Sequence, residues 1–278
     1  MDGSVDETLK LHEQSIKERI KANGWGVSQA TPHRRRKRYR YSSWTPAEIT
    51  TSLWLDAADA GTITEAAGFV SQWDDKSGNG NDLSQGAGSL QPSTGVRTIN
   101  GRNALYFNNS GLRRSYVATL NPPSFSLFMV VLSDVTDADT RSPVVTRYDI
   151  GAKLGYMMFK QGDNSWAAYV GDGAPYWGDR MDGPTPVAVK PTMLGLSADE
   201  TSSSFRVDGR VSSVNGGAYT PNPSSPFFLG CQDDAYRTWD GLIAEVVLVP
   251  GVLDSGSRLM MEAYLVAKWG IPNAYPTV

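Results

Sequence analysis

The stretch Ser203–Val214, SSFRVDGRVSSV, decides the fold class of this chain. Phe205 and Val207 alternate with polar neighbours, which gives the run one apolar face and one polar face, as in a half-buried β-strand. The dipeptide Asp208-Gly209 then stands between two such runs, and it is typical of the two-residue turn that joins antiparallel strands. The sequence therefore predicts a β-hairpin at this point.

Short runs of the same kind fill most of the chain beyond Trp44. No run alternates with a long helical pattern, so a parallel α/β sheet is not expected. We therefore predict an antiparallel two-sheet jelly-roll sandwich, an all-β fold, over residues 45–278. The predicted strands are Ser52–Asp56, Gly68–Asp74, Asn103–Phe107, Ser126–Ser133, Pro143–Tyr148, Leu154–Lys160, Ser165–Val170, Pro186–Ser197, Ser203–Asp208, Arg210–Val214, Phe227–Gly230 and Gly241–Pro250.

One helix is expected near the end of the chain. Asp254 or Ser255 can cap it, and Gly270 and Pro272 can end it. Helical spacing is kept by Leu259, Met260, Ala263, Tyr264 and Ala267. A single helix after a long series of strands is expected to lie across one end or edge of the sandwich.

Composition narrows the class of protein. The chain has 278 residues, of which 40% are apolar and 20% charged, as in a globular protein with a sizeable core. Cys231 is the only cysteine, so no intramolecular disulfide can form, and folding in a reducing cytosol is expected. We expect no membrane helix, because no run approaches the roughly 20 apolar residues that one needs. The charged start does not read as a signal peptide.

The first 44 residues differ from the rest in charge. They carry ten Lys/Arg and five Asp/Glu, a net +5, while residues 45–278 carry sixteen and twenty-four, a net −8. The segment 4–23 predicts a short helix whose thin apolar stripe includes Leu9, Ile16 and Ile20. The stretch 33–41 is dense in basic residues and contains Arg34, Arg35, Arg36, Lys37, Arg38 and Arg40.

Two interpretations of this N-terminal arm (residues 1–44) stay open. It is either a tether that grips an acidic partner or a solvated linker with incidental charge, and the charge density favours the tether. A protein surface is expected as its partner in preference to nucleic acid.

Several phrases of the sequence, taken in order, resemble the concanavalin A-like, laminin-G-like jelly-roll domains of bacteriophage structural proteins. The resemblance covers about 45–278 and implies the same jelly-roll fold, a role in the virion and, for relatives that are lectins, glycan binding. The phrases are Ser52–Asp59 (SLWLDAAD), Val70–Asp82 (VSQWDDKSGNGND), Gln91-Pro92, Ile99–Phe107 (INGRNALYF), Gly241–Val246 (GLIAEV) and Glu262–Gly270 (EAYLVAKWG).

The same superfamily includes glucanases, so the resemblance leaves catalysis as an alternative. Glycoside hydrolysis usually needs two carboxylates at a set separation. No predicted strand shows acidic residues at alternating positions, and Glu245 stands alone between Ala244 and Val246. His12 and His33 both lie in the arm. We therefore expect that the protein is not an enzyme.

Two loops have the composition of a sugar site, with aromatic residues among acidic residues and glycines. The first, 171–182, offers Tyr176, Trp177 and Asp179, and the second, 232–240, offers Tyr236 and Trp239. The alternative is that these tryptophans cap the ends of the sandwich or contact a protein neighbour.

A third loop is rich in oxygen ligands of the kind that calcium prefers. The candidate ligands are Asp74, Asp75, Asn79, Asn81 and Asp82. Turns rich in Asp, Asn and Gly also form without metal, through side-chain to backbone hydrogen bonds. We expect no cofactor, with calcium at this loop as the alternative.

Together these features favour a phage virion protein, made in the host cytoplasm and displayed on the virion surface. Its arm would bind other virion proteins, and its jelly roll would decorate the head or neck or bind host-surface glycans as a tail-associated adhesin. Multiple copies or a homo-oligomer are expected on the particle. The alternatives are a polysaccharide-degrading enzyme of the jelly-roll glucanase type and a free bacterial carbohydrate-binding protein.

Overall fold

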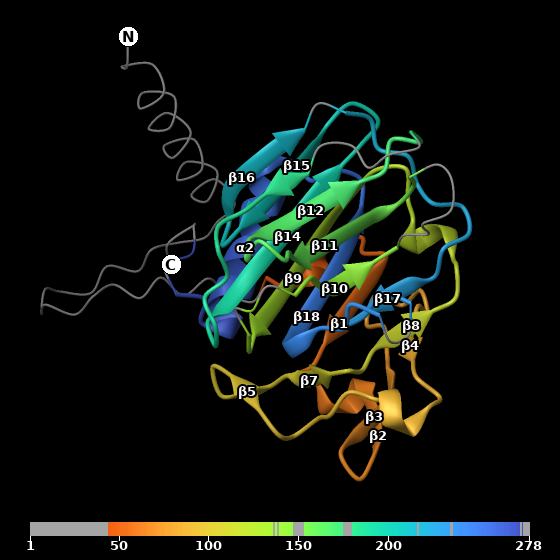
Figure 1. The fold of residues 1–278 in the computed structure, drawn as a ribbon, viewed down its shortest axis with the longest axis vertical. Helices are drawn as coiled ribbons and strands as arrows, with labels where there is room; N and C mark the ends of the chain where they lie inside the picture. Colours follow the sequence, from red (N-terminus) through yellow and green to blue (C-terminus); the bar gives the residue numbers. More distant parts are fainter. Residues whose placement is uncertain are drawn as a thin grey trace, which may run out of the picture. The chain divides into compact units, whose positions relative to one another are not determined.

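A computed structural model describes residues 44–135, 137, 139–146, 153–174, 180–215, 217–233, 236–272 and 274. The predicted arm, with its helix at 4–23 and its basic stretch, lies outside these residues, so the boundary at residue 44 stays a prediction. The described part is an antiparallel β sandwich with one C-terminal helix, which confirms the predicted fold class (Figure 1).

Two sheets form the sandwich, and every strand pair within them is antiparallel. The seven-stranded sheet has the order β1-β18-β9-β14-β15-β16, with β7 paired to β18. Its strands are β1 (Leu53–Asp56), β7 (Leu105–Asn108), β9 (Phe125–Ser133), β14 (Pro191–Ala198), β15 (Ser203–Val207), β16 (Arg210–Asn215) and β18 (Asp240–Pro250).

The nine-stranded sheet has the order β13-β12-β11-β10-β17-β8-β4-β3-β2. Its strands are β2 (Ile63–Ala66), β3 (Phe69–Trp73), β4 (Leu83–Ser84), β8 (Leu112–Arg114), β10 (Arg141–Val145), β11 (Tyr156–Lys160), β12 (Trp166–Val170), β13 (Met181–Asp182) and β17 (Phe227–Leu229). A separate hairpin joins β5 (Thr98–Ile99) to β6 (Arg102–Asn103), and four 3-10 turns complete the fold: η1 (Pro46–Glu48), η2 (Ala60–Thr62), η3 (Gly88–Leu90) and η4 (Ala118–Leu120).

The predicted hairpin is confirmed in detail. β15 and β16 are joined by Asp208 and Gly209, whose φ angles are 51° and 77°. A two-residue turn with positive φ at both positions matches the right-handed twist of its strands, and glycine adopts that conformation without strain. The alternation of apolar and polar residues in this run therefore predicted correctly which side chains face the core, with Phe205 among them.

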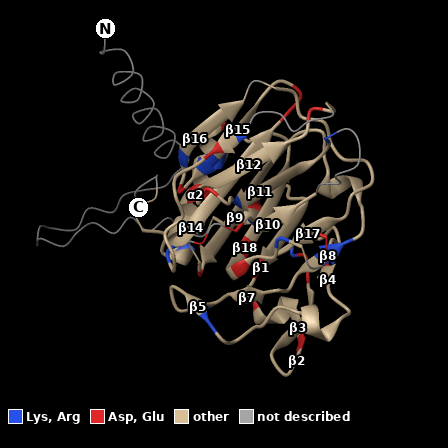
Figure 2. Cartoon of the chain, in the orientation of Figure 1, with Lys and Arg blue, Asp and Glu red and all other residues tan. Residues whose placement is uncertain are grey.

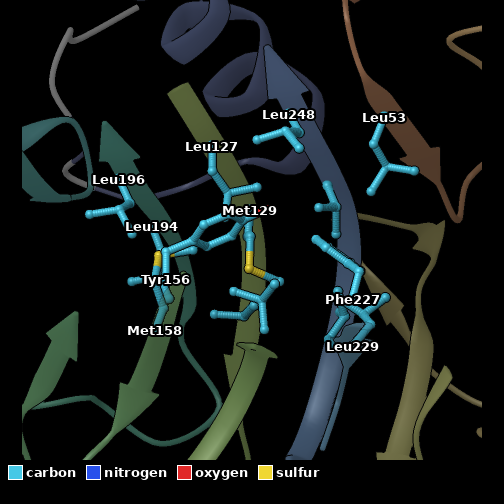
Figure 3. Close-up of a cluster of buried hydrophobic side chains, with 14 of the residues drawn as sticks. Leu53, Leu127, Met129, Tyr156, Met158, Leu194, Leu196, Phe227, Leu229 and Leu248 are labelled. Carbon is cyan, nitrogen blue, oxygen red and sulfur yellow. The ribbon is translucent and has the colours of Figure 1, made fainter. Parts of the chain in front are cut away.

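The central strands β9 and β18 are buried on both faces. In β9, Leu127, Met129 and Val131 point into the space between the sheets, while the intervening Phe128 and Val130 point to the outer face of the seven-stranded sheet. Figure 3 shows part of this layer, in which Met129 lies beside Tyr156 of the opposite sheet; Leu248, Phe227 and Leu229 belong to the same buried cluster. The nearly continuous apolar sequence of these strands follows from this double burial.

Helix α2 (Ser255–Trp269) covers that outer face. Asp254 caps it by accepting hydrogen bonds from the backbone N–H of Gly256 and Ser257, and Gly270 ends it in the left-handed region at φ 64°. The expectation that the helix lies across an end or edge of the sandwich is wrong. The second apolar face of β9 and β18 needs a cover, and α2 provides it with its own buried face.

Candidate functional site

A short loop between β17 and β18 exposes one aromatic ring. Backbone hydrogen bonds in both directions between Gln232 and Tyr236, of 2.8 and 3.1 Å, close this loop. The Tyr236 side chain is 56% exposed, and the Arg237 guanidinium carbon lies 5.0 Å from the centre of its ring. Arg237 also donates to the Gln232 side-chain oxygen at 3.4 Å. The loop therefore presents a supported, exposed aromatic ring.

A chain of hydrogen-bonded polar side chains continues from this loop. The Thr238 hydroxyl donates to Asn109 Oδ1 at 3.2 Å, Asn109 Nδ2 donates to Asn108 Oδ1 at 3.3 Å, and Asn108 Nδ2 donates to the Tyr106 hydroxyl at 3.3 Å. Asn108 and Asn109 are exposed. We call this group the Tyr236 surface; it consists of Tyr106, Asn108, Asn109, Gln232, Tyr236, Arg237 and Thr238.

Ionised side chains border the Tyr236 surface. Asp240 lies opposite Asn108 in the β7–β18 pair, and its carbonyl accepts the backbone N–H of Asp134 at 3.1 Å. Asp134 forms an ion pair with Arg97, whose guanidinium lies 5.3 Å from the centre of the Tyr106 ring. Across the described chain, Lys and Arg are interspersed with Asp and Glu (Figure 2).

The carboxyl groups of this border differ in acidity. Burial raises the pKa of Asp240; Arg141 opposes that shift, while nearby Asp134 and Asp137 add to it. The hydrogen bond from Arg141 holds the pKa of Asp137 far below its usual range, and Lys160, whose Nζ lies 2.9 Å from Asp137 Oδ1, lowers it further.

The second aromatic residue of this loop has a different place. Trp239 is 0% exposed and stacks on Trp166 with ring centres 5.8 Å apart, and its Nε1 donates to the Leu242 carbonyl at 3.3 Å. The prediction that Trp239 contacts a glycan is therefore wrong, because its ring is part of the core between the sheets. The other predicted sugar loop cannot be compared, since Tyr176, Trp177 and Asp179 lie outside the described residues.

The loop predicted as a calcium site covers the edge of β1. Asp75 Oδ1 accepts the backbone N–H of Trp54 at 2.9 Å, and the N–H of Lys76 donates to the Trp54 carbonyl at 2.8 Å. The amide groups of Asn81 and Asn79 donate to the carbonyls of Ser52 and Thr51, both at 2.8 Å.

The remaining acidic groups of this loop are also engaged. Asp75 Oδ2 accepts from the Ser77 hydroxyl and from the backbone N–H of Asn81. Asp82 Oδ1 accepts the N–H of Asp75, and Asp74 Oδ1 accepts from Gln72. A carboxylate that faces N–H donors is not aimed at a cation, so side-chain to backbone hydrogen bonding accounts for these residue types. The described residues contain no group of three His, Cys, Asp or Glu that could hold a metal ion, and calcium here stays a prediction.

A buried polar cluster joins α2 to the seven-stranded sheet, and the sequence did not reveal it. Glu245 is fully buried; its Oε1 accepts from Trp54 Nε1 and the Tyr264 hydroxyl, both at 2.8 Å, and its Oε2 accepts from Trp269 Nε1 at 2.6 Å. Lys268 Nζ lies 2.8 Å from Glu245 Oε2 and 2.7 Å from Asp56 Oδ1. Burial raises the pKa of Glu245, while Lys268 opposes that shift.

This Glu245 cluster consists of Trp54, Asp56, Lys76, Glu245, Tyr264, Lys268 and Trp269. Lys76 bridges Asp56 and Asp59 at 3.1 and 2.7 Å. Four of the sequence phrases quoted above, which lie far apart in the chain, therefore meet in one buried hydrogen-bonded group. Both oxygens of Glu245 are occupied, so its isolation in the sequence reflects a structural position.

The predicted anchoring residues of the arm, Leu9, Ile16, Ile20, Arg34, Arg35, Arg36, Lys37, Arg38 and Arg40, lie outside the described residues. Among the residues that are described, no helix has the length and apolar character needed to cross a membrane.

The fold has relatives among solved structures. No protein-family model matches the chain, and no curated protein matches it. The binding domain of Paraclostridial Mosquitocidal Protein 1 is similar with a TM-score of 0.57 and 11% identity, over 84% of this chain and 57% of that one. A sialidase of Trypanosoma rangeli in complex with sialic acid is similar with a TM-score of 0.53 and 18% identity, over 78% of this chain.

These likenesses show a shared β-sandwich fold. The chain spans about a third of the length of the sialidase, 33% of it. They also correct one expectation: chains with this fold include an enzyme, so the lack of a paired-carboxylate strand in the sequence does not support the statement that the protein is not an enzyme. The virion role has no counterpart in these comparisons.

Proposed function

We propose that the sandwich is a glycan-binding domain and that the Tyr236 surface is its contact surface. The observation that carries this proposal is the exposed Tyr236 ring on a loop whose Thr238 begins a chain of hydrogen-bonded side chains through Asn109 and Asn108. A sugar ring has an apolar edge that stacks on an aromatic face and hydroxyl groups that need directed donors and acceptors. Tyr236 offers the first kind of contact, and Asn108, Asn109 and Arg237 offer the second.

We further propose that the domain is displayed on a phage virion and that residues 1–44 hold it there. The support is the resemblance of the sequence phrases and the division of charge, with +5 on the arm and −8 on residues 45–278. A basic segment rich in arginine suits an acidic protein surface, since each guanidinium can donate several hydrogen bonds to carboxylates. Host-surface glycans would then be the ligands of the displayed domain.

A glycan array with the full chain tests the binding proposal, followed by calorimetry with the best ligand. Replacing Tyr236 by Ala removes the stacking ring, and we expect a loss of about 2 kcal/mol, or roughly 30-fold in affinity. Tyr116→Ala is the matched control, because Tyr116 is another exposed tyrosine that lies outside the Tyr236 surface. An array without any ligand, or equal affinities for the Tyr236 variant and the parent, contradicts the proposal.

A second candidate function is glycoside cleavage at the same surface. It is favoured by the likeness of the fold to a sialidase of Trypanosoma rangeli. Asp240, which lies opposite Asn108 of the Tyr236 surface and whose pKa is raised by burial, is the candidate general acid. The test is release of reducing ends from the glycans that bind on the array. Asp240→Asn should abolish release and leave binding intact, whereas Asp199→Asn, in an exposed turn, should change neither. No release by the parent protein excludes this candidate and leaves the binding proposal standing.

A further inference from the structure

The two edges of the seven-stranded sheet differ in how they are covered. At β1 the loop 74–82 occupies the backbone groups of Trp54 and Ser52, as described above. At the other end of the strand order, β16 pairs with β15 on one side, and no described strand pairs with its other side. An open strand edge is a template for pairing with another chain.

The sequence of β16 lacks most of the usual protection of an edge. Natural sheets guard their edges with Lys, Pro or inward-pointing charges. Residues 210–215 read RVSSVN, with one charge, that of Arg210, at the start of the strand. Val211 and Val214 are 52% and 64% exposed. A strand with β-branched residues and a single charge is suited to pairing with another strand and is poorly suited to exposure to solvent.

A bulge brings these two valines to the same face. Val211 lies opposite Arg206 and Ser213 opposite Phe205, so Ser212 is the extra residue. Val214 lies opposite Ser204. Phe205 points into the core, so its neighbours Arg206 and Ser204 point to the outer face, and both valines share that face. In a regular strand, residues three positions apart would point to opposite faces.

More apolar surface lies beside the turn that leads into β16. Val187 and Val189 are both exposed, and Val189 has a φ of 60°, a strained conformation for a β-branched residue. The next residue, Lys190, forms an ion pair of 2.7 Å with Asp208 of the β15–β16 turn, so this segment reaches that turn, while the N–H of Val189 donates to the Ser133 carbonyl of β9 at 2.8 Å. Two of the nine large apolar residues that are exposed in the described chain, Val211 and Val214, therefore lie on the edge strand itself.

We propose that β16 is a homodimer interface, at which a second copy of this chain pairs its own β16 antiparallel across a two-fold axis. The strand is self-complementary in that arrangement. With the axis between Ser212 and Ser213, Val211 faces Val214 of the partner on both sides of the axis, and Arg210 faces Asn215. No like charges meet, and the four valines form one apolar cluster.

The size of this surface sets the strength of the dimer. A strand of six residues is about 20 Å long. Pairing of the two β16 strands, together with Val211 and Val214 of both copies, would bury no more than the lower limit of stable interfaces, about 1,000 Å² in total. The dimer should therefore dissociate at micromolar concentration. The inference is independent of the proposed glycan function, although a dimer would present two Tyr236 surfaces and increase avidity for a multivalent ligand.

Sedimentation velocity of the full chain, from micromolar to submillimolar concentration, tests the interface through charge reversal. Val211→Lys with Val214→Lys places lysines opposite each other, and Val211→Glu with Val214→Glu does the same with carboxylates. Each pair should weaken the dimer about 100-fold. Val211→Lys with Val214→Glu places opposite charges in contact across the axis and should restore dimers. Val96→Lys is the control, since Val96 is also exposed and lies in another loop.

Thermal unfolding confirms that each variant is folded before it is sedimented. The proposal is overturned if the parent chain is monomeric at every concentration, or if the Lys/Lys variant dimerises as the parent does. It is overturned in its stated register if the Lys/Glu variant is as monomeric as the Lys/Lys variant.

Discussion

Lys268 is the residue whose removal best tests the role assigned to the Glu245 cluster. Its ammonium group is shared by the fully buried Glu245 and by Asp56, while the Lys268 side chain is itself only 13% exposed. Replacing it by Met keeps the aliphatic stem and leaves Glu245 without its counter-ion. Breaking a buried ion pair costs about 3–5 kcal/mol. We expect the Lys268→Met variant to lose about 3 kcal/mol of its free energy of unfolding, the lower end of that range. The reason is that Glu245 keeps three hydrogen bonds and Asp56 keeps its ion pair with Lys76.

The loss should depend on pH in a defined direction. Burial raises the pKa of Glu245 above its ordinary value of 4.5. At a pH between the pKa of the unfolded chain and that of the folded protein, the folded protein therefore holds a proton on Glu245 that the unfolded chain releases. Stability therefore falls as the pH rises between these two pKa values. Removing Lys268 takes away the charge that opposes the shift and extends this window upward. The cost of Lys268→Met should be largest at neutral pH and should shrink as the pH falls toward 4.5.

Urea unfolding at neutral pH and at mildly acidic pH measures both quantities, and thermal melting should show a decrease of about 6–12 °C at neutral pH for a domain of this size. Adding Glu245→Gln to the Lys268 variant should recover part of the loss, because no unpaired charge then remains. Lys190→Met is the control: its ion pair with Asp208 is less buried, and we expect a loss of about 1 kcal/mol or less. An equal loss at both pH values, or no recovery in the double variant, would refute the reasoning.

Three further changes separate the roles of the other segments. Asp75→Asn places an N–H donor opposite the backbone N–H groups that now donate to the Asp75 carboxylate, and it should lower the free energy of unfolding by about 2–3 kcal/mol. EDTA should leave the melting temperature of the parent protein unchanged. A lower melting temperature in EDTA would show that the loop holds a metal ion. Gly241→Ala should prevent stable folding, as judged by circular dichroism, because Gly241 has φ 144° and a Cβ there would collide with the Leu132 carbonyl oxygen; a variant with parental melting would contradict that register. Deletion of residues 1–44 should abolish incorporation into virions and leave glycan binding unchanged, and normal incorporation of the shortened protein would assign the virion contact to the sandwich.

Local patterns in the sequence determined the elements that depend on neighbouring residues. The Asp208-Gly209 turn, the caps Asp254 and Gly270 and the double apolar pattern of β18 all follow from backbone sterics and side-chain periodicity, and all are present in the structure. The shortest strands, such as β4 with two residues, escaped prediction because alternation cannot be recognised over so few positions.

The candidate site depended on tertiary structure much more strongly. The loop 232–240 contains Tyr236 and Trp239 in similar local sequence, yet one ring is exposed and the other is in the core. The Trp239 ring is placed by stacking on Trp166, and the loop is held to β10 by the N–H of Ser142, which donates to the Arg237 carbonyl; both partners are distant in the chain. Composition can therefore identify a loop with the residue types of a sugar site, but it does not determine which of its aromatic rings is exposed.

In the other motifs, too, the sequence shows which residue types are present, whereas the structure determines what each residue contacts. Asp, Asn and Gly in the loop 74–82 indicate a tight polar loop, and that much is determined by the sequence itself. That this loop covers β1 is determined by the strand that lies beside it. An Asp residue looks the same in the sequence whether its carboxylate accepts hydrogen bonds from N–H groups or binds a cation. Glu245 is a lone acidic residue in the sequence and the centre of a buried cluster in the structure. The fold brings its partners together from separate segments, and only that long-range packing determines what a buried charge contacts.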